Sequence, residues 1–287
     1  MQKHESSSST THVTHKDSGW RLFLRTVIAR AYPRLIGQQR EPSWLIFEVV
    51  MPIGTTIAYV LVYKALRAPE EYIGFVVMGG AMTAFWMNVL WSMASQLYWE
   101  KETGNLALYI IAPNPKMAVL LGMALGGMAA TSLRALIVIL IGSLLFDVTY
   151  RVTDFMQLFA VFLLTMVALY GMGMMLASAF LLFGREAWNL VSLAQEPIFL
   201  VSGFFFPLKA LPFWVGIIAS IVPVTLGMDA MRQLVFPSAF PFGFLDVRTE
   251  IAVLAGLAVV FLVSAKWLLD YVERLAVREG RLTESRR

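Results

Sequence analysis

Cysteine is absent from this chain of 287 residues, and histidine occurs only at His4, His12 and His15. The first absence excludes disulfide bonds, thiolate metal sites and cysteine nucleophiles. Because all three histidines precede the first apolar segment, imidazole cannot serve as a proton shuttle or metal ligand in the body of the protein. Chemistry inside that body would have to use carboxylates, and we expect no metal site.

Charge is also scarce: 15% of the residues are charged, 58% are hydrophobic and the mean hydropathy is +0.69. Soluble domains carry roughly 25% charged and roughly 45–50% apolar residues, and disordered chains need low hydrophobicity. The composition therefore excludes both classes. It predicts an all-α, polytopic membrane protein whose length leaves no room for a second large soluble domain.

Six apolar segments are predicted as membrane spans, because a transmembrane helix needs about 20 residues. The segments comprise residues 44–63, 73–97, 117–146, 155–183, 187–203 and 250–270. We therefore predict a six-span transmembrane domain over residues 44–272. A disordered cytoplasmic tail (1–18) and a basic cytoplasmic tail (273–287) are expected to flank it.

Residues 204–236 are apolar but interrupted by Pro207, Pro212 and Pro223. The uninterrupted pieces, of about 10–13 residues, are too short to cross a bilayer and are typical of re-entrant or interfacial helices. We predict a re-entrant helical hairpin between spans five and six.

Residues 19–43 are predicted to form an amphipathic interfacial helix. Its apolar arc at helical spacing consists of Trp20, Leu24, Val27, Ile28, Ala31 and Leu35. Arg21 and Arg25 flank this arc on one side, and Arg30 and Arg34 flank it on the other. Such a helix lies at the membrane surface with its arginines reaching toward head groups. The alternative is a helix that packs on another domain.

Lysine and arginine indicate the orientation. They are frequent in both terminal flanks, whereas two predicted opposite-side loops hold only Lys64 with Arg67 and Arg151. With an even number of spans, the positive-inside rule places both termini in the cytoplasm and the re-entrant hairpin on the outer side. The net charge of +4 is thus a topology signal and does not indicate nucleic-acid binding.

Three of the charged residues inside predicted spans stand out: Glu48, Arg134 and Glu196. Each costs about 2.5–3.5 kcal/mol on insertion scales. We hypothesise that Arg134 pairs with a carboxylate, Glu196 being the first choice, and so locks spans three and five together. Lining of a substrate path and snorkelling to water are the alternatives.

The loop between spans two and three carries Glu100, Lys101, Glu102 and Gly104 and ends at two prolines. A short charged helix over residues 98–108 could fit a groove on a soluble partner and transmit rigid-body motion to the membrane domain. Spacing alone favours the simpler interpretation, a solvated loop.

The pattern Glu-x-x-x-Gly-x-Leu-x-x-x-x-x-x-Pro at 100–113 resembles the coupling-helix loop of ABC-transporter permeases of the drug and polysaccharide export class, the ABC-2-type membrane family. A second resemblance, to the outer re-entrant segment of that family, rests on Gly203, Phe206, Pro207, Pro212, Pro223, Asp229 and Arg232. The resemblance covers residues 20–275. Asn105 departs from it, because the family commonly has Thr at this position.

The resemblance implies a permease subunit of an ATP-driven exporter, with Glu100, Lys101, Glu102 and Gly104 coupling it to the ATPase. Similar proteins assemble as two permease copies with two ATPases, so a homodimer in a bacterial-type inner membrane is expected. The expected substrate is amphipathic: a drug, a lipid or a lipid-linked glycan. An exporter of O-antigen-like or teichoic-acid-like polysaccharide is the alternative.

A nucleotide site is not expected on this chain, because no G-x-x-x-x-G-K-[ST] pattern occurs. ATP and Mg²⁺ are therefore expected on the partner ATPase, with no cofactor bound by this chain. The Gly-x-x-x-Gly run from Gly122 to Gly126 fits close helix packing instead.

Two other functional classes were weighed. A membrane-embedded lipid-modifying enzyme would need clustered carboxylates or histidines, but Asp147, Asp154, Asp246 and Glu250 show no spacing that requires a shared site. A secondary transporter would couple through Glu48 or Glu196.

Overall fold

The computed structural model describes residues 19–40, 42–111, 115–236 and 243–279. These residues form helices joined by short connections, without a β-strand among them. The all-α prediction is confirmed. The predicted tail at 1–18 lies outside the described residues, and the predicted boundary at residue 272 falls inside a helix that continues to Glu279.

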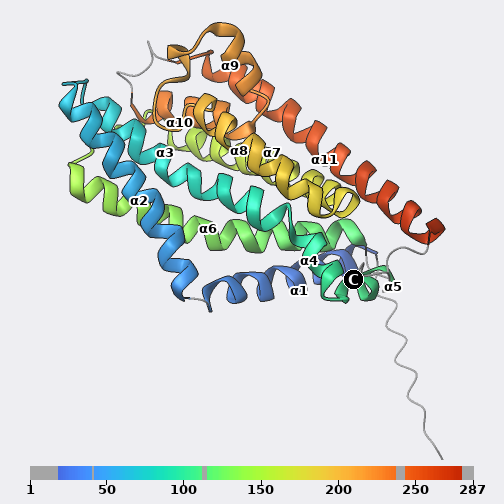
Figure 1. Cartoon of the computed structure of the whole chain (residues 1–287). Helices are drawn as coiled ribbons and strands as arrows, with labels where there is room; N and C mark the ends of the chain where they lie inside the picture. Colours follow the sequence, from blue (N-terminus) through green and yellow to red (C-terminus); the bar gives the residue numbers. More distant parts are fainter. Residues whose placement is uncertain (1–18, 41, 112–114, 237–242, 280–287) are drawn as a thin grey trace, which may run out of the picture.

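Figure 1 shows the order of the elements along the chain. They are α1 (Gly19–Gln39), α2 (Pro42–Ala65), α3 (Glu71–Met87), the π-helical turn η1 (Asn88–Met93), α4 (Gln96–Glu102), α5 (Asn105–Ile111), α6 (Lys116–Phe146), α7 (Phe155–Phe183), α8 (Arg185–Val201), the 3₁₀ turn η2 (Leu208–Ala210), α9 (Phe213–Ala219), α10 (Pro223–Val235) and α11 (Val247–Glu279).

Five helical stretches of the described residues are long and apolar enough to cross a membrane. They are Glu48–Ala65, Glu71–Glu102, Lys116–Phe146, Phe155–Phe183 and Val247–Leu275. The pair α9 and α10, bent by 112°, would make a sixth if it formed one broken crossing. The chain is thus a multi-pass membrane protein. The predicted fifth span, 187–203, corresponds to α8, whose 17 residues are not in this set.

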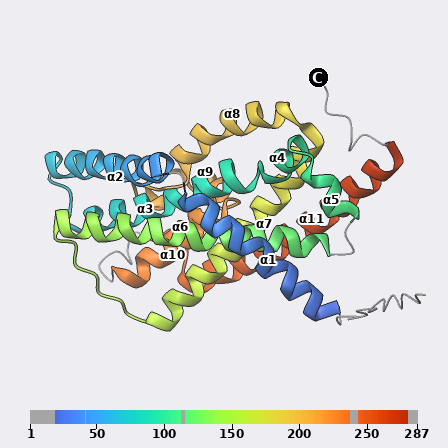
Figure 2. The same ribbon diagram turned by 90° about the horizontal axis from the view of Figure 1, so that it is seen from below.

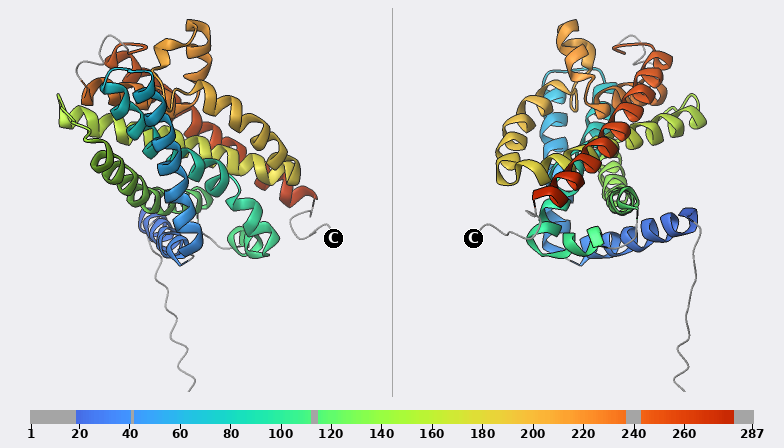
Figure 3. Two further views of the ribbon diagram at one scale, coloured as in Figure 1. Left: turned by 60° about the vertical axis from the view of Figure 1, so that its left-hand side comes forward. Right: turned by 90° about the vertical axis from the view of Figure 1, so that its right-hand side faces the viewer.

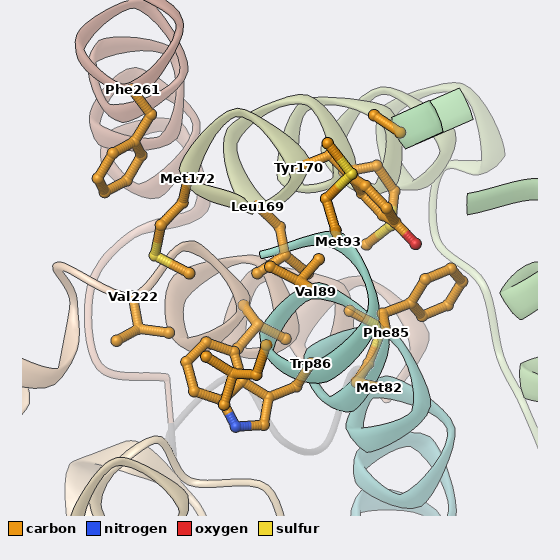
Figure 4. Packing of buried hydrophobic residues seen from close by; sticks show 14 of the residues in the cluster. Met82, Phe85, Trp86, Val89, Met93, Leu169, Tyr170, Met172, Val222 and Phe261 are labelled. Carbon is orange, nitrogen blue, oxygen red and sulfur yellow. The ribbon is translucent and has the colours of Figure 1, made fainter. Parts of the chain in front are cut away.

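The core of the bundle lies around α3 and η1. α3 contacts α2, α6, α10 and η1, and η1 contacts α7. Figure 4 shows Trp86, Val89 and Met93 packed against Leu169 of α7, all within the main buried cluster. By contrast, α2, α6 and α11 expose large apolar side chains along much of their length, as is expected of helix surfaces that lie inside a membrane.

Two ends of the molecule can be distinguished. In Figures 1 and 3, α1, α4 and α5 lie together at one end, and α9 lies at the opposite end. In Figure 2, α8 runs from the neighbourhood of α4 back toward α9. α8 contacts α7 and α9.

Two glycines of α6 explain how α1 is attached. A Cβ atom on Gly122 would lie 2.5 Å from the carbonyl oxygen of Val27, and one on Gly126 would lie 2.5 Å from that of Ala31. Only glycine permits this approach of two backbones. The Gly-x-x-x-Gly run therefore packs a helix, as predicted, and the helix that it packs is α1.

Candidate functional site

The predicted coupling helix over residues 98–108 is not one helix. α4 ends at Glu102, and α5 begins at Asn105. The break lies at Thr103 and Gly104, where Gly104 has a φ of +77°. This left-handed conformation is adopted readily by glycine and ends a helix. The structure therefore has two short helices joined by a tight turn in place of the single predicted helix. We call α4, this turn and α5 the corner.

Glu100 is the centre of a polar network between α1 and this corner. Its Oε1 accepts a hydrogen bond from Arg30 Nη2 at 2.9 Å and another from Gln96 Nε2 at 3.1 Å. Its Oε2 accepts one from the Tyr109 hydroxyl at 3.0 Å. The Arg30 guanidinium also lies 4.2 Å from the centre of the Tyr109 ring. Burial raises the pKa of the Tyr109 hydroxyl, which keeps it a neutral donor.

Arg34 extends the network by one turn of α1. Its Nη2 donates to the Ser92 carbonyl oxygen at 3.0 Å, and its guanidinium also contacts the Ser92 hydroxyl and the Gln96 side-chain oxygen. The expectation that Arg30 and Arg34 reach toward head groups is therefore wrong. They bind η1 and α4 because the close contact of α1 with α6 turns their side of the helix inward.

The four predicted coupling residues divide into two groups. Glu100 is only 9% exposed and faces Arg30, whereas Glu102 and Gly104 are exposed and Lys101 is half-buried. The outer surface of the corner is thus formed by residues 101–104. Glu100 holds the corner in place instead of offering its charge to solvent.

An aromatic cluster connects the corner with α8. Trp188 of α8 lies 6.4 Å from Tyr98, 6.2 Å from Trp99 and 5.6 Å from Trp91 between ring centres. The sequence analysis missed this cluster, because residues about 90 positions apart show no periodic signal of contact. The available clue was the presence of three tryptophans near the ends of two predicted spans.

The buried arginine Arg134 pairs with Glu48 of α2, not with Glu196. Arg134 is 3% exposed, and α6 packs against α2, whereas α8 packs against α7 and α9. The position of a residue along its own helix does not determine which helix is its neighbour. Glu196 lies on the exposed side of α8.

Glu48→Gln is expected to lower the free energy of unfolding by about 3–5 kcal/mol, because it leaves Arg134 buried without a counter-charge. Thermal or denaturant unfolding of the purified protein in detergent measures this loss. The double variant Glu48→Arg with Arg134→Glu should recover part of it. A recovery by Glu196→Arg with Arg134→Glu, and none by the first double variant, would contradict the observed pairing.

Arg232 of α10 fastens the loop that follows α8. Its Nη1 donates to the carbonyl oxygens of Gly203 at 2.7 Å and Phe206 at 3.4 Å. Its Nη2 donates to those of Phe204 at 2.6 Å and Phe75 at 2.7 Å. The guanidinium is 2% exposed, so the carbonyl groups replace its water. Because Phe75 belongs to α3, this cluster ties the loop to the central helix. We call it the outer clamp, after the side of the membrane on which the distribution of lysine and arginine predicts it to lie.

The other predicted residues of this segment occupy defined structural positions. Gly203 has a φ of +69°, within the turn that presents its carbonyl group to Arg232. Pro207 and Pro212 precede η2 and α9, and Pro223 is the first residue of α10, a position where the missing N–H costs nothing. Phe206 is half-buried.

Asp229, three residues before Arg232 on α10, forms a second set of hydrogen bonds. Its Oδ2 accepts hydrogen bonds from the Phe244 backbone N–H at 2.8 Å and from Gln233 Nε2 at 3.0 Å. Gln233 also donates to Glu250 of α11, which is fully buried. The Asp-x-x-Arg pattern is thus a pair of anchors that attach α10 to α11 and to the outer clamp.

In the sequence the corner precedes the loop after α8 and α10, which form most of the outer clamp. Comparison with curated proteins found no match. A protein-family model described as ABC-2 type transporter matches residues 27–236, which is more than half of the chain and includes both the corner and the outer clamp. With its apolar helices and this match, the chain belongs to the ABC-2 type transporter family of membrane proteins.

Proposed function

We propose that this protein is the permease subunit of an ATP-driven exporter, which moves an amphipathic substrate out of the cytoplasm or the inner leaflet. Two copies of a separate ATPase subunit bind ATP and Mg²⁺ and drive the permease. Family membership supports a permease. The coupling role is supported by the corner of α4 and α5, which is exposed at residues 102–104 and fastened at Glu100.

The single observation that carries the proposal is this combination of an exposed contact surface and a buried fastening. A partner that presses on Glu102 and Gly104 moves a segment tied to α1 through Glu100 and Arg30. Such a tie transmits rigid-body motion, because packed elements with charge-assisted hydrogen bonds shift together.

Motion of α4 is transmitted to two helices of the bundle, α8 and α3. Tyr98 and Trp99 contact Trp188 of α8, and η1 joins α4 to the buried helix α3. A π-helical turn is often found at functional sites. We infer that closure of the ATPases displaces α8 relative to α3 and opens the substrate path.

Two permease copies would form the complete path. α2 and α8 contact few other helices and expose most of their side chains, including Val50, Leu61 and Leu193. A second copy of the chain covers these faces in the proposed assembly. We infer that the protein lies in a bacterial-type plasma membrane. Both termini are then on the cytoplasmic side, as the distribution of lysine and arginine predicts.

Glu102→Arg is expected to reduce co-purification of the ATPase at least tenfold, because it reverses a charge on the exposed corner. The measurement is recovery of ATPase subunits on the affinity-tagged full-length permease after co-expression. Glu70→Arg, also an exposed reversal but before α3 on the predicted outer side, is the matched control and should retain the ATPase. Equal recovery with both variants, or the absence of any nucleotide-binding ATPase from the wild-type sample, would refute the proposal.

A further inference from the structure

α8 carries a polar stripe where a lipid-facing helix would be apolar. The stripe consists of Arg185, Asn189, Ser192 and Glu196, which are all exposed and recur at spacings of four, three and four residues. This spacing places them on one face of a helix. The exposed faces of α6 and α11 carry residues such as Leu144 and Val263 instead.

The stripe extends along the bundle and is not confined to one end. α8 spans about 25 Å at 1.5 Å per residue and runs from the α4 end toward α9 (Figure 2). A carboxyl side chain such as that of Glu196 avoids hydrocarbon and faces a water-filled path, another polar group or a charged ligand. The stripe therefore belongs to a polar path and not to the lipid surface.

Glu196 offers a negative charge to that path. In the described part of the chain it forms no ion pair, and its hydrogen bond comes from the side-chain amide of its neighbour Gln195 at 3.4 Å. Arg134, the partner hypothesised from the sequence, is paired with Glu48. Arg185, the cation of the stripe, is 11 positions away at the first residue of α8, about 16 Å along the helix axis.

Two tryptophan rings are connected to this carboxylate through Gln195, its neighbour in the sequence. Gln195 accepts a hydrogen bond from Trp91 Nε1 at 2.6 Å, and Trp91 stacks on Trp188 with 5.6 Å between ring centres. Trp188 precedes Glu196 by two turns, about 12 Å along the axis. Neither tryptophan is fully buried. The Glu196 carboxylate and the two indole rings thus lie within a distance that a small amphipathic molecule can span.

We propose that Glu196 and the rings of Trp91 and Trp188 form a binding site for a small amphipathic organic cation. The carboxylate provides the counter-charge, and the indole rings attract both the cation and its apolar groups. The inference rests on the proposed function, since it names the substrate class of the exporter. It places recognition beside α4, where the corner contacts Trp188.

The test uses the full-length permease in nanodiscs without any ATPase. Binding of tritiated tetraphenylphosphonium, a lipophilic cation, is compared with that of the neutral analogue triphenylphosphine oxide. Glu196→Gln should weaken tetraphenylphosphonium binding at least tenfold and change binding of the neutral analogue less than twofold. Glu186→Gln, the same replacement at another exposed glutamate of α8, should bind both compounds like the wild type.

Two further variants keep the test decisive. Glu196→Asp retains the charge and should bind the cation within threefold of the wild type, even if Glu196→Gln is poorly folded. Trp188→Leu should weaken both compounds. Saturable binding of the cation that is equal in the wild type and Glu196→Gln, an equal loss of both compounds in Glu196→Gln, or no saturable binding in the wild type would overturn the proposal.

This experiment is independent of the coupling experiment. If the ATPase co-purifies but the cation does not bind through Glu196, only the substrate class is wrong. If the cation binds through Glu196 but no ATPase assembles, the binding site stands and the exporter function fails.

Discussion

Arg232→Ala is expected to lower the free energy of unfolding by about 3–5 kcal/mol, as much as the loss of the counter-charge of Arg134. The side chain satisfies four backbone carbonyl groups from α3 and the loop after α8. Its removal leaves buried acceptors without donors, each costing about 1–3 kcal/mol. The loop and α3 would then lose their direct attachment.

The measurement is thermal or denaturant unfolding of the purified protein in detergent. Arg232→Lys should recover only part of the loss, because an ammonium group cannot reproduce the planar fork of the guanidinium. Arg248→Ala, at an exposed arginine close by in sequence, is the control and should change stability little. An Arg232→Ala protein within about 1 kcal/mol of the wild type would show that the outer clamp is not needed for folding.

Gly122→Ala combined with Gly126→Ala should displace α1 from α6. The two new Cβ atoms would each lie 2.5 Å from a backbone carbonyl oxygen of α1, closer than van der Waals contact allows. Because these neighbours are backbone atoms, α1 itself has to move. Overpacking of this kind costs about 1–3 kcal/mol, and here it also separates Arg30 from Glu100.

The absence of cysteine makes this displacement measurable. Ile28→Cys and Leu125→Cys, both at exposed positions, introduce spin-label sites on α1 and α6 without a competing thiol. The distance between the labels should lengthen in the double-alanine protein, and stimulation of the ATPase by the permease should fall. Gly256→Ala, where a Cβ atom meets open space, is the control. An unchanged distance would mean that α6 accommodates the added methyl groups without moving α1.

Local sequence patterns predicted the class of the fold and most of its breaks. Long apolar segments require helices in a membrane, because an unpaired backbone group in hydrocarbon is too costly. The prolines at 212 and 223 correctly predicted where short helices would start, since proline removes a backbone donor. The predicted helix over 98–108 was wrong because a glycine inside a charged segment does not reveal its left-handed conformation.

The polar stripe of α8 can be recognised in the sequence. It was overlooked because most residues of the segment 187–203 are hydrophobic, and the segment was therefore predicted as a membrane span. Its spacing of four and three residues can be read directly from positions 185–196. α8, which has 17 residues, is not among the helices that are long and apolar enough to cross a membrane. What the spacing cannot indicate is that Trp91, about a hundred residues earlier, donates a hydrogen bond to the same helix.

By itself, the sequence determined that this is a helical, multi-pass membrane protein that buries costly charges. Only the tertiary structure decided which groups meet: Arg134 with Glu48, Arg30 with Glu100, and Arg232 with four carbonyl groups. The reason is physical. Spacing along a helix specifies which side chains share a face, but the helix that covers this face depends on how all the segments pack together. Here two glycines of α6 admit α1, and the inward-facing arginines of α1 follow from that contact.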